Sequence, residues 1–175
     1  VDRAGNLYWV NGSGANVCMR TPAGEVSEFV NTGAGPNGAA FAANGDIYIC
    51  EPRLHAIVIA HPDRTWETYL TACDGEALRG PNDLVFDASG GFYFTDPGGS
   101  DEKNIIGTVH YVDAQGKTSL VAKKLAFPNG IILTPDGKKL YVGESKKNRV
   151  LVYEVLAPGQ LGEQKVLADL PKIDP

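Results

Sequence analysis

Residues 80–96 read GPNDLVFDASGGFYFTD, and the pattern of this stretch recurs along the chain. Each copy starts at an Asn and has a Gly eight residues later. It continues with a short apolar or aromatic run that ends in an acid fourteen or fifteen residues after the Asn. The asparagines are Asn37, Asn82 and Asn129, and the acids are Glu51, Asp96 and Glu144. Residues 5–11, GNLYWVN, match the second half of the same unit. The chain is therefore built from an internal repeat.

The spacing of the repeat indicates its architecture. The asparagines are 45 and 47 residues apart, and a fixed period of this size is typical of a solenoid or a propeller. Short β-branched and aromatic runs alternate with Gly, Asp, Asn and Pro, and no apolar segment has a helical period, so we expect about four strands per repeat. A four-stranded repeat is a propeller blade. In the Asn82 copy the strands are expected at 84–86, 92–95, 108–112 and 119–122.

The whole chain, residues 1–175, is expected to form a single all-β domain, a β-propeller with about four blades. The blades are expected at roughly 1–34, 35–79, 80–126 and 127–175, with residues 71–79 crossing from the second blade to the third. The inner strand of the first blade would precede Val1, and a fifth blade would begin at Pro175. We therefore expect a part of a longer propeller, incomplete at both ends and able to self-associate through open blade edges.

Composition and charge narrow the functional classes. A hydrophobic content of 43% with 21% charged residues is typical of a soluble globular protein. The net charge is −5, and the paired lysines are interpreted as solvated turn residues rather than a basic stripe, which argues against a nucleic-acid surface. No apolar run is long enough to span a bilayer. We therefore expect neither nucleic acid nor a membrane as a partner.

The cysteines bear on the cellular compartment. Cys18, Cys50 and Cys73 are odd in number and have no metal-ligand spacing, which is typical of reduced thiols in a cytosolic protein. A cytoplasmic location is therefore expected. Secretion or a periplasmic location stays open, because the chain begins inside a repeat and a signal peptide would lie upstream. The histidines at 55, 61 and 110 are not spaced as a metal cluster either.

The repeated Asn is the main candidate for function. A single Pro-Asn pair is an ordinary turn, but three copies in phase would place Asn37, Asn82 and Asn129 at the start of each innermost strand, facing a common axis. Asp83 is interpreted either as an orienting residue or substrate contact, or as a turn-capping Asp. The repeat acids either reach the mouth of the tunnel or cap surface turns, and we favour the second role for Glu144.

Four motifs carry a resemblance to a known family. They are RGPNDLVF at 79–86, YFTDP at 93–97, FPNGI at 127–131 and TPDGKKLYV at 134–142. Together they closely resemble the SMP-30/gluconolactonase/luciferin-regenerating-enzyme group of six-bladed propellers, to which squid-type diisopropylfluorophosphatase is related. The likeness covers essentially the whole chain, which would correspond to the first four blades.

The resemblance implies a divalent cation on the propeller axis, held by a Glu, an Asn and an Asp, with a further Asn that ligates or contacts substrate. Asn129 matches the metal-binding Asn and Asn82 the second one, so both are the implied metal ligands. Together with the repeat, this makes Asn82, Asp83 and Asn37 the candidate substrate contacts. Ca²⁺ is favoured, and Mg²⁺, Zn²⁺, Mn²⁺ and Fe²⁺ stay open.

The family's two carboxylates fall outside this sequence. Its Glu would lie about five residues before Val1, and its Asp, which looks to be both a ligand and the base, would lie beyond Pro175. No catalytic residue is therefore identified in the chain. Neutral carboxamides without anionic partners bind a hard cation weakly, so the chain by itself is expected to hold a half-site and to be inactive.

The leading functional hypothesis is metal-dependent hydrolysis of a sugar lactone or another small cyclic ester. The absence of a Gly-x-Ser-x-Gly motif weighs against a serine esterase of the α/β-hydrolase type. One alternative is an organophosphate or ester hydrolase on the same scaffold. Another is a non-catalytic propeller that binds a protein or carbohydrate through its loops. A binding propeller needs no ring of asparagines in phase, and chelators should not affect it.

Overall fold

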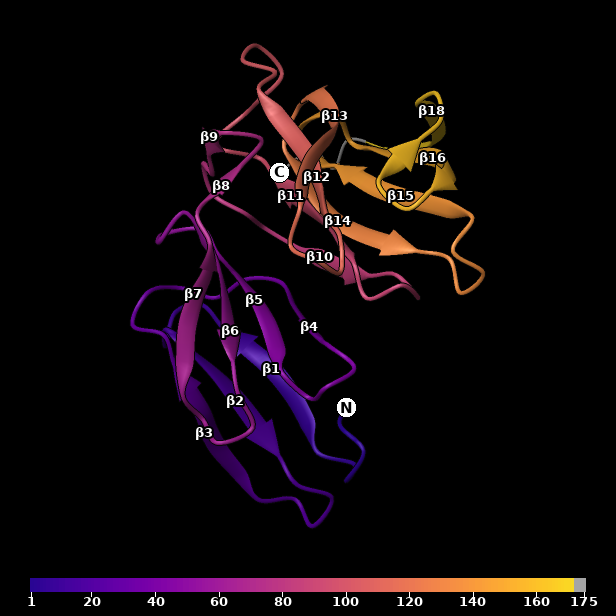
Figure 1. The fold of residues 1–175 in the computed structure, drawn as a ribbon. Coiled ribbons are helices and arrows are strands. Elements are labelled where there is room, and N and C mark those ends of the chain that lie inside the picture. Colours follow the sequence, from indigo (N-terminus) through magenta and orange to yellow (C-terminus); the bar gives the residue numbers. More distant parts are fainter. Residues whose placement is uncertain (172–175) are drawn as a thin grey trace.

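Antiparallel sheets account for most of the regular structure in the computed structural model, which describes residues 1–171. Four large sheets follow one another along the chain, and within each the strands pair mainly in chain order. Figure 1 shows the first two sheets, indigo to magenta, on one side of the molecule and the last two, ending in yellow, on the other. The all-β prediction is confirmed, and the four strands expected in the Asn82 repeat are all present.

The strand bounds are as follows. The first sheet has β1 (Leu7–Asn11), β2 (Asn16–Arg20) and β3 (Val26–Asn31). The second has β4 (Ala39–Phe41), β5 (Ile47–Glu51), β6 (Ala56–Ala60) and β7 (Trp66–Leu70). The third has β10 (Leu84–Phe86), β11 (Phe92–Asp96), β12 (Gly107–Val112) and β13 (Thr118–Leu125). The fourth has β14 (Pro128–Leu133), β15 (Lys139–Glu144), β16 (Arg149–Ala157), β17 (Gln160–Leu161) and β18 (Lys165–Asp169).

The repeated Gly has a conformational role. Gly45, Gly90 and Gly137 lie in the turns between the first and second strands of their sheets, with φ of 95°, 87° and 69°. Only Gly adopts such values without steric cost. Its position eight residues after each Asn therefore fixes where the innermost strand ends and the chain reverses.

The core lies between neighbouring sheets. All five residues of β11 are buried. Because side chains alternate along a strand, β11 contributes residues to the core on each face of the third sheet. Phe92 and Phe94 join a cluster with residues of the second sheet, including Ile57. Tyr93 joins a cluster with residues of the fourth sheet, including Leu140. Each sheet is thus packed face to face on the next, as propeller blades are.

The segment between the second and third sheets is more ordered than the sequence predicted. Instead of simply crossing over, it forms a short hairpin of β8 (Ala72–Cys73) and β9 (Glu76–Ala77). Asp74 at its tip links the hairpin to β13. Its N–H donates to Oγ1 of Thr118 at 3.1 Å, and its Oδ2 accepts the N–H of Leu120 at 3.1 Å. The Asp74-Gly75 pair, with φ of 53° and 82°, is the local signal of this tight turn, while bonds that span 44 and 46 residues hold the hairpin against β13.

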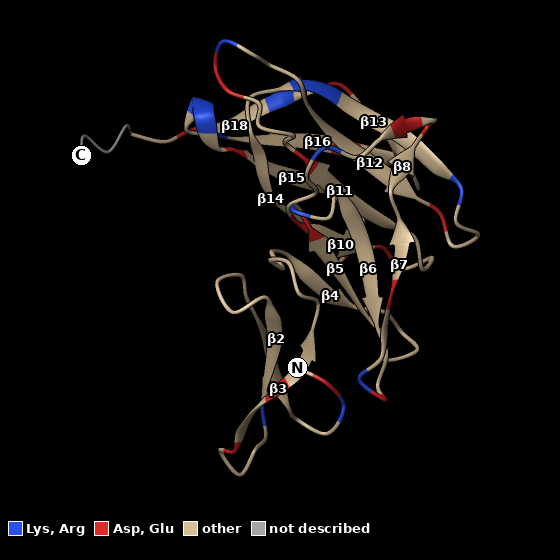
Figure 2. Ribbon diagram, turned by 90° about the vertical axis from the view of Figure 1, so that its left-hand side faces the viewer, with Lys and Arg blue, Asp and Glu red and all other residues tan. Residues whose placement is uncertain are grey.

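Charged residues lie mainly in turns and at strand ends, with both signs interspersed (Figure 2). Two of the lysine pairs do not lie in turns, where the sequence had predicted them. Lys123 and Lys124 lie in strand β13 rather than in a turn, and they are exposed there because β13 is the outermost strand of its sheet. Lys146 and Lys147 belong to a short 3-10 helix, η1 (Ser145–Lys147). Within residues 1–171, no helix has the length and hydrophobicity that crossing a membrane requires.

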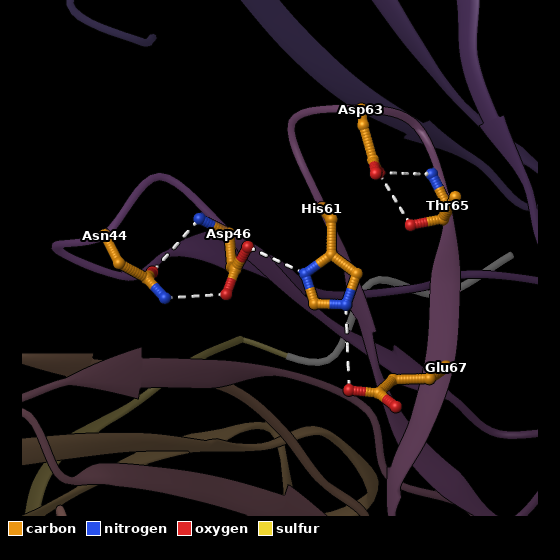
Figure 3. A network of polar contacts seen from close by, with 6 residues as sticks. All are labelled: Asn44, Asp46, His61, Asp63, Thr65 and Glu67. Carbon is orange, nitrogen blue, oxygen red and sulfur yellow. Dashed lines mark hydrogen bonds and ion pairs between the residues drawn. The ribbon is translucent and has the colours of Figure 1, made fainter.

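A polar network joins two turns of the second sheet, at the end opposite to Asn37 (Figure 3). His61 Nδ1 lies 2.9 Å from Oδ1 of Asp46, and its Nε2 lies 3.6 Å from Oε1 of Glu67. Asn44 donates to Oδ2 of Asp46 at 2.7 Å and so orients that carboxylate. The hydrogen bond to Asp46 raises the pKa of His61 above its usual value, although partial burial opposes this.

The raised pKa predicts how stability depends on pH. A histidine whose pKa is higher in the folded state contributes stability that is fully present below its unfolded pKa of about 6.5 and is lost as the pH rises through the folded value. We therefore expect the melting temperature to fall between about pH 6 and pH 8 more for the parent than for His61→Gln. Asp46→Asn should flatten the same profile. Equal pH dependence in all three proteins would contradict the prediction.

Candidate active site

The three repeated Asn segments lie side by side at the entry to the innermost strands. Asn37 and Asn82 each stand two residues before a strand, β4 and β10, and Asn129 is the second residue of β14. The N–H of Gly38 donates to the carbonyl of Asn82 at 2.7 Å. The N–H of Ile131 donates to Oδ2 of Asp83 at 3.1 Å. The fold thus brings together three segments that are far apart in the sequence.

The carboxamides of the three repeated asparagines differ in their burial. Asn82 is 7% exposed, Asn129 is partly buried and Asn37 is exposed. In the part of the chain that the structure describes, no hydrogen bond to another protein group uses any of the three carboxamides. By contrast, Asn6 and Asn44 donate to neighbouring carboxylates. Asn82 is largely buried, but its amide atoms remain accessible to solvent, so the carboxamide is available to a ligand.

Asp83 occupies the junction between the three segments. Its Oδ1 accepts the N–H of Leu84 at 2.9 Å, and its Oδ2 accepts the N–H of Ile131 in the next sheet. On its other side Gly38 is packed so closely that a Cβ there would collide with Asp83. The carboxylate therefore does more than cap its own turn, since it also aligns the Asn129 segment. A direct contact of Asp83 with substrate stays a prediction.

The repeat acids are buried anchors. Glu51 and Glu144 are 0% exposed and Asp96 is 1% exposed. Each accepts the backbone N–H of a residue that lies two or three positions before the Asn of its own repeat. The pairs are Glu51 with Gly35 at 2.9 Å, Asp96 with Arg79 at 2.9 Å and Glu144 with Ala126 at 2.7 Å. Both sequence interpretations, tunnel mouth and surface turn, are therefore wrong. These backbone groups enter from a connecting segment without a strand partner, and a buried N–H requires an acceptor.

The surroundings of the acids differ from one repeat to the next. Glu144 has two cationic neighbours, Arg149, which donates to Oε2, and Lys147, whose Nζ lies 3.6 Å from Oε1. Asp96 Oδ1 is buried and has no partner in residues 1–171. Burial raises the pKa of Asp96, while the N–H of Arg79 opposes that rise. None of these carboxylates is presented to a small molecule at the Asn face.

The oxygen atoms near the repeated asparagines would suit a hard cation. Among residues 1–171, no group of three or more His, Cys, Asp and Glu side chains is arranged to hold a metal. The oxygen donors near the Asn face are instead the carboxamides of Asn82 and Asn129, beside one carboxylate, Asp83. Carboxamide and carboxylate oxygens fit Ca²⁺ or Mg²⁺ in kind, and they bring few negative charges.

One residue that the sequence did not single out belongs to this region. Thr95 is completely buried at the end of β11, and its hydroxyl donates to the carbonyl of Asn129 at 2.7 Å. It stands directly before the repeat acid, where the other copies have Cys50 and Gly143. That difference between the copies is the signal that could have identified it.

Comparison with known proteins gives the family. Residues 1–175 match the SMP-30/gluconolactonase/LRE-like region. The gluconolactonase of Zymomonas mobilis is 30% identical over 79% of this chain and 42% of its own length. Lactonase drp35 of Staphylococcus saprophyticus is 42% identical over 45% of this chain and 24% of its own length.

Solved structures show the same fold. A gluconolactonase from Xanthomonas campestris superposes with a TM-score of 0.85 at 24% identity, over 96% of this chain and 60% of that one. A streptogramin B lyase superposes with a TM-score of 0.72 at 20% identity, over 98% of this chain and 53% of that one. The propeller prediction is thereby confirmed, and this chain spans about half of the proteins that it matches. The chain belongs to the SMP-30/gluconolactonase/LRE-like family.

Proposed function

We propose that the protein containing this chain hydrolyses a sugar lactone or a related small cyclic ester at a divalent cation on the propeller axis. The observation that carries the proposal is the match of the whole chain to a family whose relatives include a gluconolactonase and lactonases. The carboxamides of Asn82 and Asn129, which no other protein group in residues 1–171 uses, support it.

Each residue near the repeated asparagines would have a separate role in this reaction. Asn129 and Asn82 would hold the cation through their carboxamide oxygens, and Asp83 keeps their two backbone segments in register. A bound cation would withdraw electron density from the lactone carbonyl and stabilise the negative charge that develops as water adds. The ring C–O bond then breaks, the leaving alkoxide takes up a proton, and the product is a hydroxy acid. Asn37, which is exposed, would contact the substrate hydroxyls.

The base and the remaining anionic ligands have no candidate among the repeat acids. Glu51 and Asp96 each hold a backbone N–H and are 0% and 1% exposed. Using either as a ligand or a base would release a buried backbone donor, which is costly. The resemblance assigns these roles to carboxylates outside residues 1–175. That assignment is part of the proposal, as is the preference for Ca²⁺.

A chelation experiment tests the function. With glucono-δ-lactone as substrate, the protein that contains this chain is expected to release acid in a pH-stat assay, to stop after EDTA treatment, and to recover when Ca²⁺ or another divalent cation is restored. Activity that EDTA leaves unchanged would contradict the proposal. Turnover of diisopropyl fluorophosphate without lactone turnover would favour the organophosphate alternative. No turnover of either would favour a binding propeller.

A further inference from the structure

The Asn129 segment is only partly held by its own sheet, through the residue pairs on either side of it. Strands β14 and β15 pair in regular register from Ile131 to Leu133, but the register shifts between Pro128 and Ile131. Asn129 and Gly130 therefore form a bulge that leaves the ladder. A bulge redirects side chains and leaves backbone groups without partners, so something outside the fourth sheet must fix the position of this Asn.

Thr95 of the third sheet supplies that support. Its Oγ1 donates to the carbonyl of Asn129 at 2.7 Å and accepts the N–H of Asp83 at 3.2 Å. Its backbone binds the other Asn segment: the carbonyl of Thr95 accepts the N–H of Asn82 at 2.9 Å, and its N–H donates to the carbonyl of Asp83 at 3.0 Å. One buried residue thus contacts the segments of both candidate ligands.

Only this repeat carries a hydroxyl at the position. Cys50 has a thiol, which is a weak donor, and Gly143 has no side chain. The hydroxyl is therefore present where the next segment bulges, and it bonds the carbonyl of that segment. Thr95 is 0% exposed, so its hydroxyl serves the protein's own backbone.

We propose that Thr95 is a positioning residue for the cation site, setting the separation of the Asn82 and Asn129 carboxamides through their backbones. The inference rests on the proposed function, because those carboxamides are its ligands. Partners that orient metal ligands typically change metal affinity by about 10- to 100-fold when they are removed. Thr95 is assigned this role although it touches neither the cation nor the substrate.

Three variants separate positioning from general stability. Thr95→Val keeps the shape and removes the hydroxyl, and Thr95→Ser restores it. Thr108→Val is the matched control, since Thr108 is also a buried threonine of the third sheet, with its hydroxyl on the carbonyl of Asp96 and beside His110. Each variant is made in the whole protein that contains this chain and is titrated with Ca²⁺ in a calorimeter. The exchange of the Ile131 amide proton is followed by NMR without added cation.

Thr95→Val is expected to weaken Ca²⁺ binding about 10- to 100-fold and to accelerate exchange of the Ile131 amide. Thr95→Ser should recover most of both, and Thr108→Val should change neither. If the parent binds Ca²⁺ and Thr95→Val matches Thr108→Val in both measurements, the positioning role is overturned while the proposed function stands. If the parent binds no divalent cation, the proposed function itself is overturned, and the cation role of Thr95 is overturned with it.

Discussion

Replacing Phe94 with Ala is expected to lower the free energy of unfolding by about 3 to 5 kcal/mol, the usual cost of truncating a buried aromatic residue. Phe94 is 0% exposed. Its ring stacks on His110 with centroids 4.9 Å apart and lies 6.0 Å from the ring of Phe92. Because Phe92 and Phe94 belong to the core between the second and third sheets, the cavity would also weaken the contact between blades. Urea unfolding followed by tyrosine and tryptophan fluorescence measures the loss.

The control is Leu120→Ala in β13, where the side chain is 40% exposed. A substitution at such a site should change the free energy of unfolding by about 0.5 kcal/mol or less. If Phe94→Ala cost no more than Leu120→Ala, the core between these sheets would have to repack around the missing ring, and the assignment of Phe94 as a packing centre would be wrong.

Replacing Asn129 with Ala is expected to have the opposite profile: hydrolysis is abolished while stability changes little. The carboxamide of Asn129 makes no hydrogen bond to the described chain, its carbonyl is held by Thr95, and Asp83 accepts the nearby N–H of Ile131. The change therefore removes a proposed cation ligand and leaves the packing intact. The measurements are the rate of lactone hydrolysis with saturating Ca²⁺, the Ca²⁺ affinity and the urea midpoint.

Asn44→Ala is the matched control, because Asn44 lies in a turn at the opposite end of the second sheet, where it binds Asp46. It should leave the rate and the Ca²⁺ affinity at the parent values. If an Asn129→Ala protein bound Ca²⁺ and hydrolysed the lactone like the parent, the assignment of Asn129 as a cation ligand would be wrong. Asn82 would then be the next residue to test.

Much of the fold could be read from the sequence because a repeat multiplies a weak local signal. The period of the Asn motif, the Gly that its turn requires and the alternation of apolar residues together predict successive antiparallel sheets. The same phase predicts that Asn37, Asn82 and Asn129 enter equivalent strands. These features depend on residues close in sequence, such as Gly90 and the β10–β11 hairpin that it permits.

The roles of the acids could not be read in this way. Glu51, Asp96 and Glu144 stand where a strand ends, and from the sequence such a residue is as consistent with a surface cap as with a site. Only the packed structure shows them 0 to 1% exposed, each beneath the segment that leads to an Asn. Burial depends on what the neighbouring blade covers, and no local pattern records it.

The sequence by itself determined the propeller and the entry of the asparagines into the first strands of its sheets, because strand periodicity and turn chemistry act over a few residues. The tertiary structure alone decided how those asparagines are held. The Thr95 to Asn129 and Asp83 to Ile131 hydrogen bonds span 34 and 48 residues. They form only when the third and fourth sheets pack together, so they are set by the geometry between blades and not by the composition of either repeat.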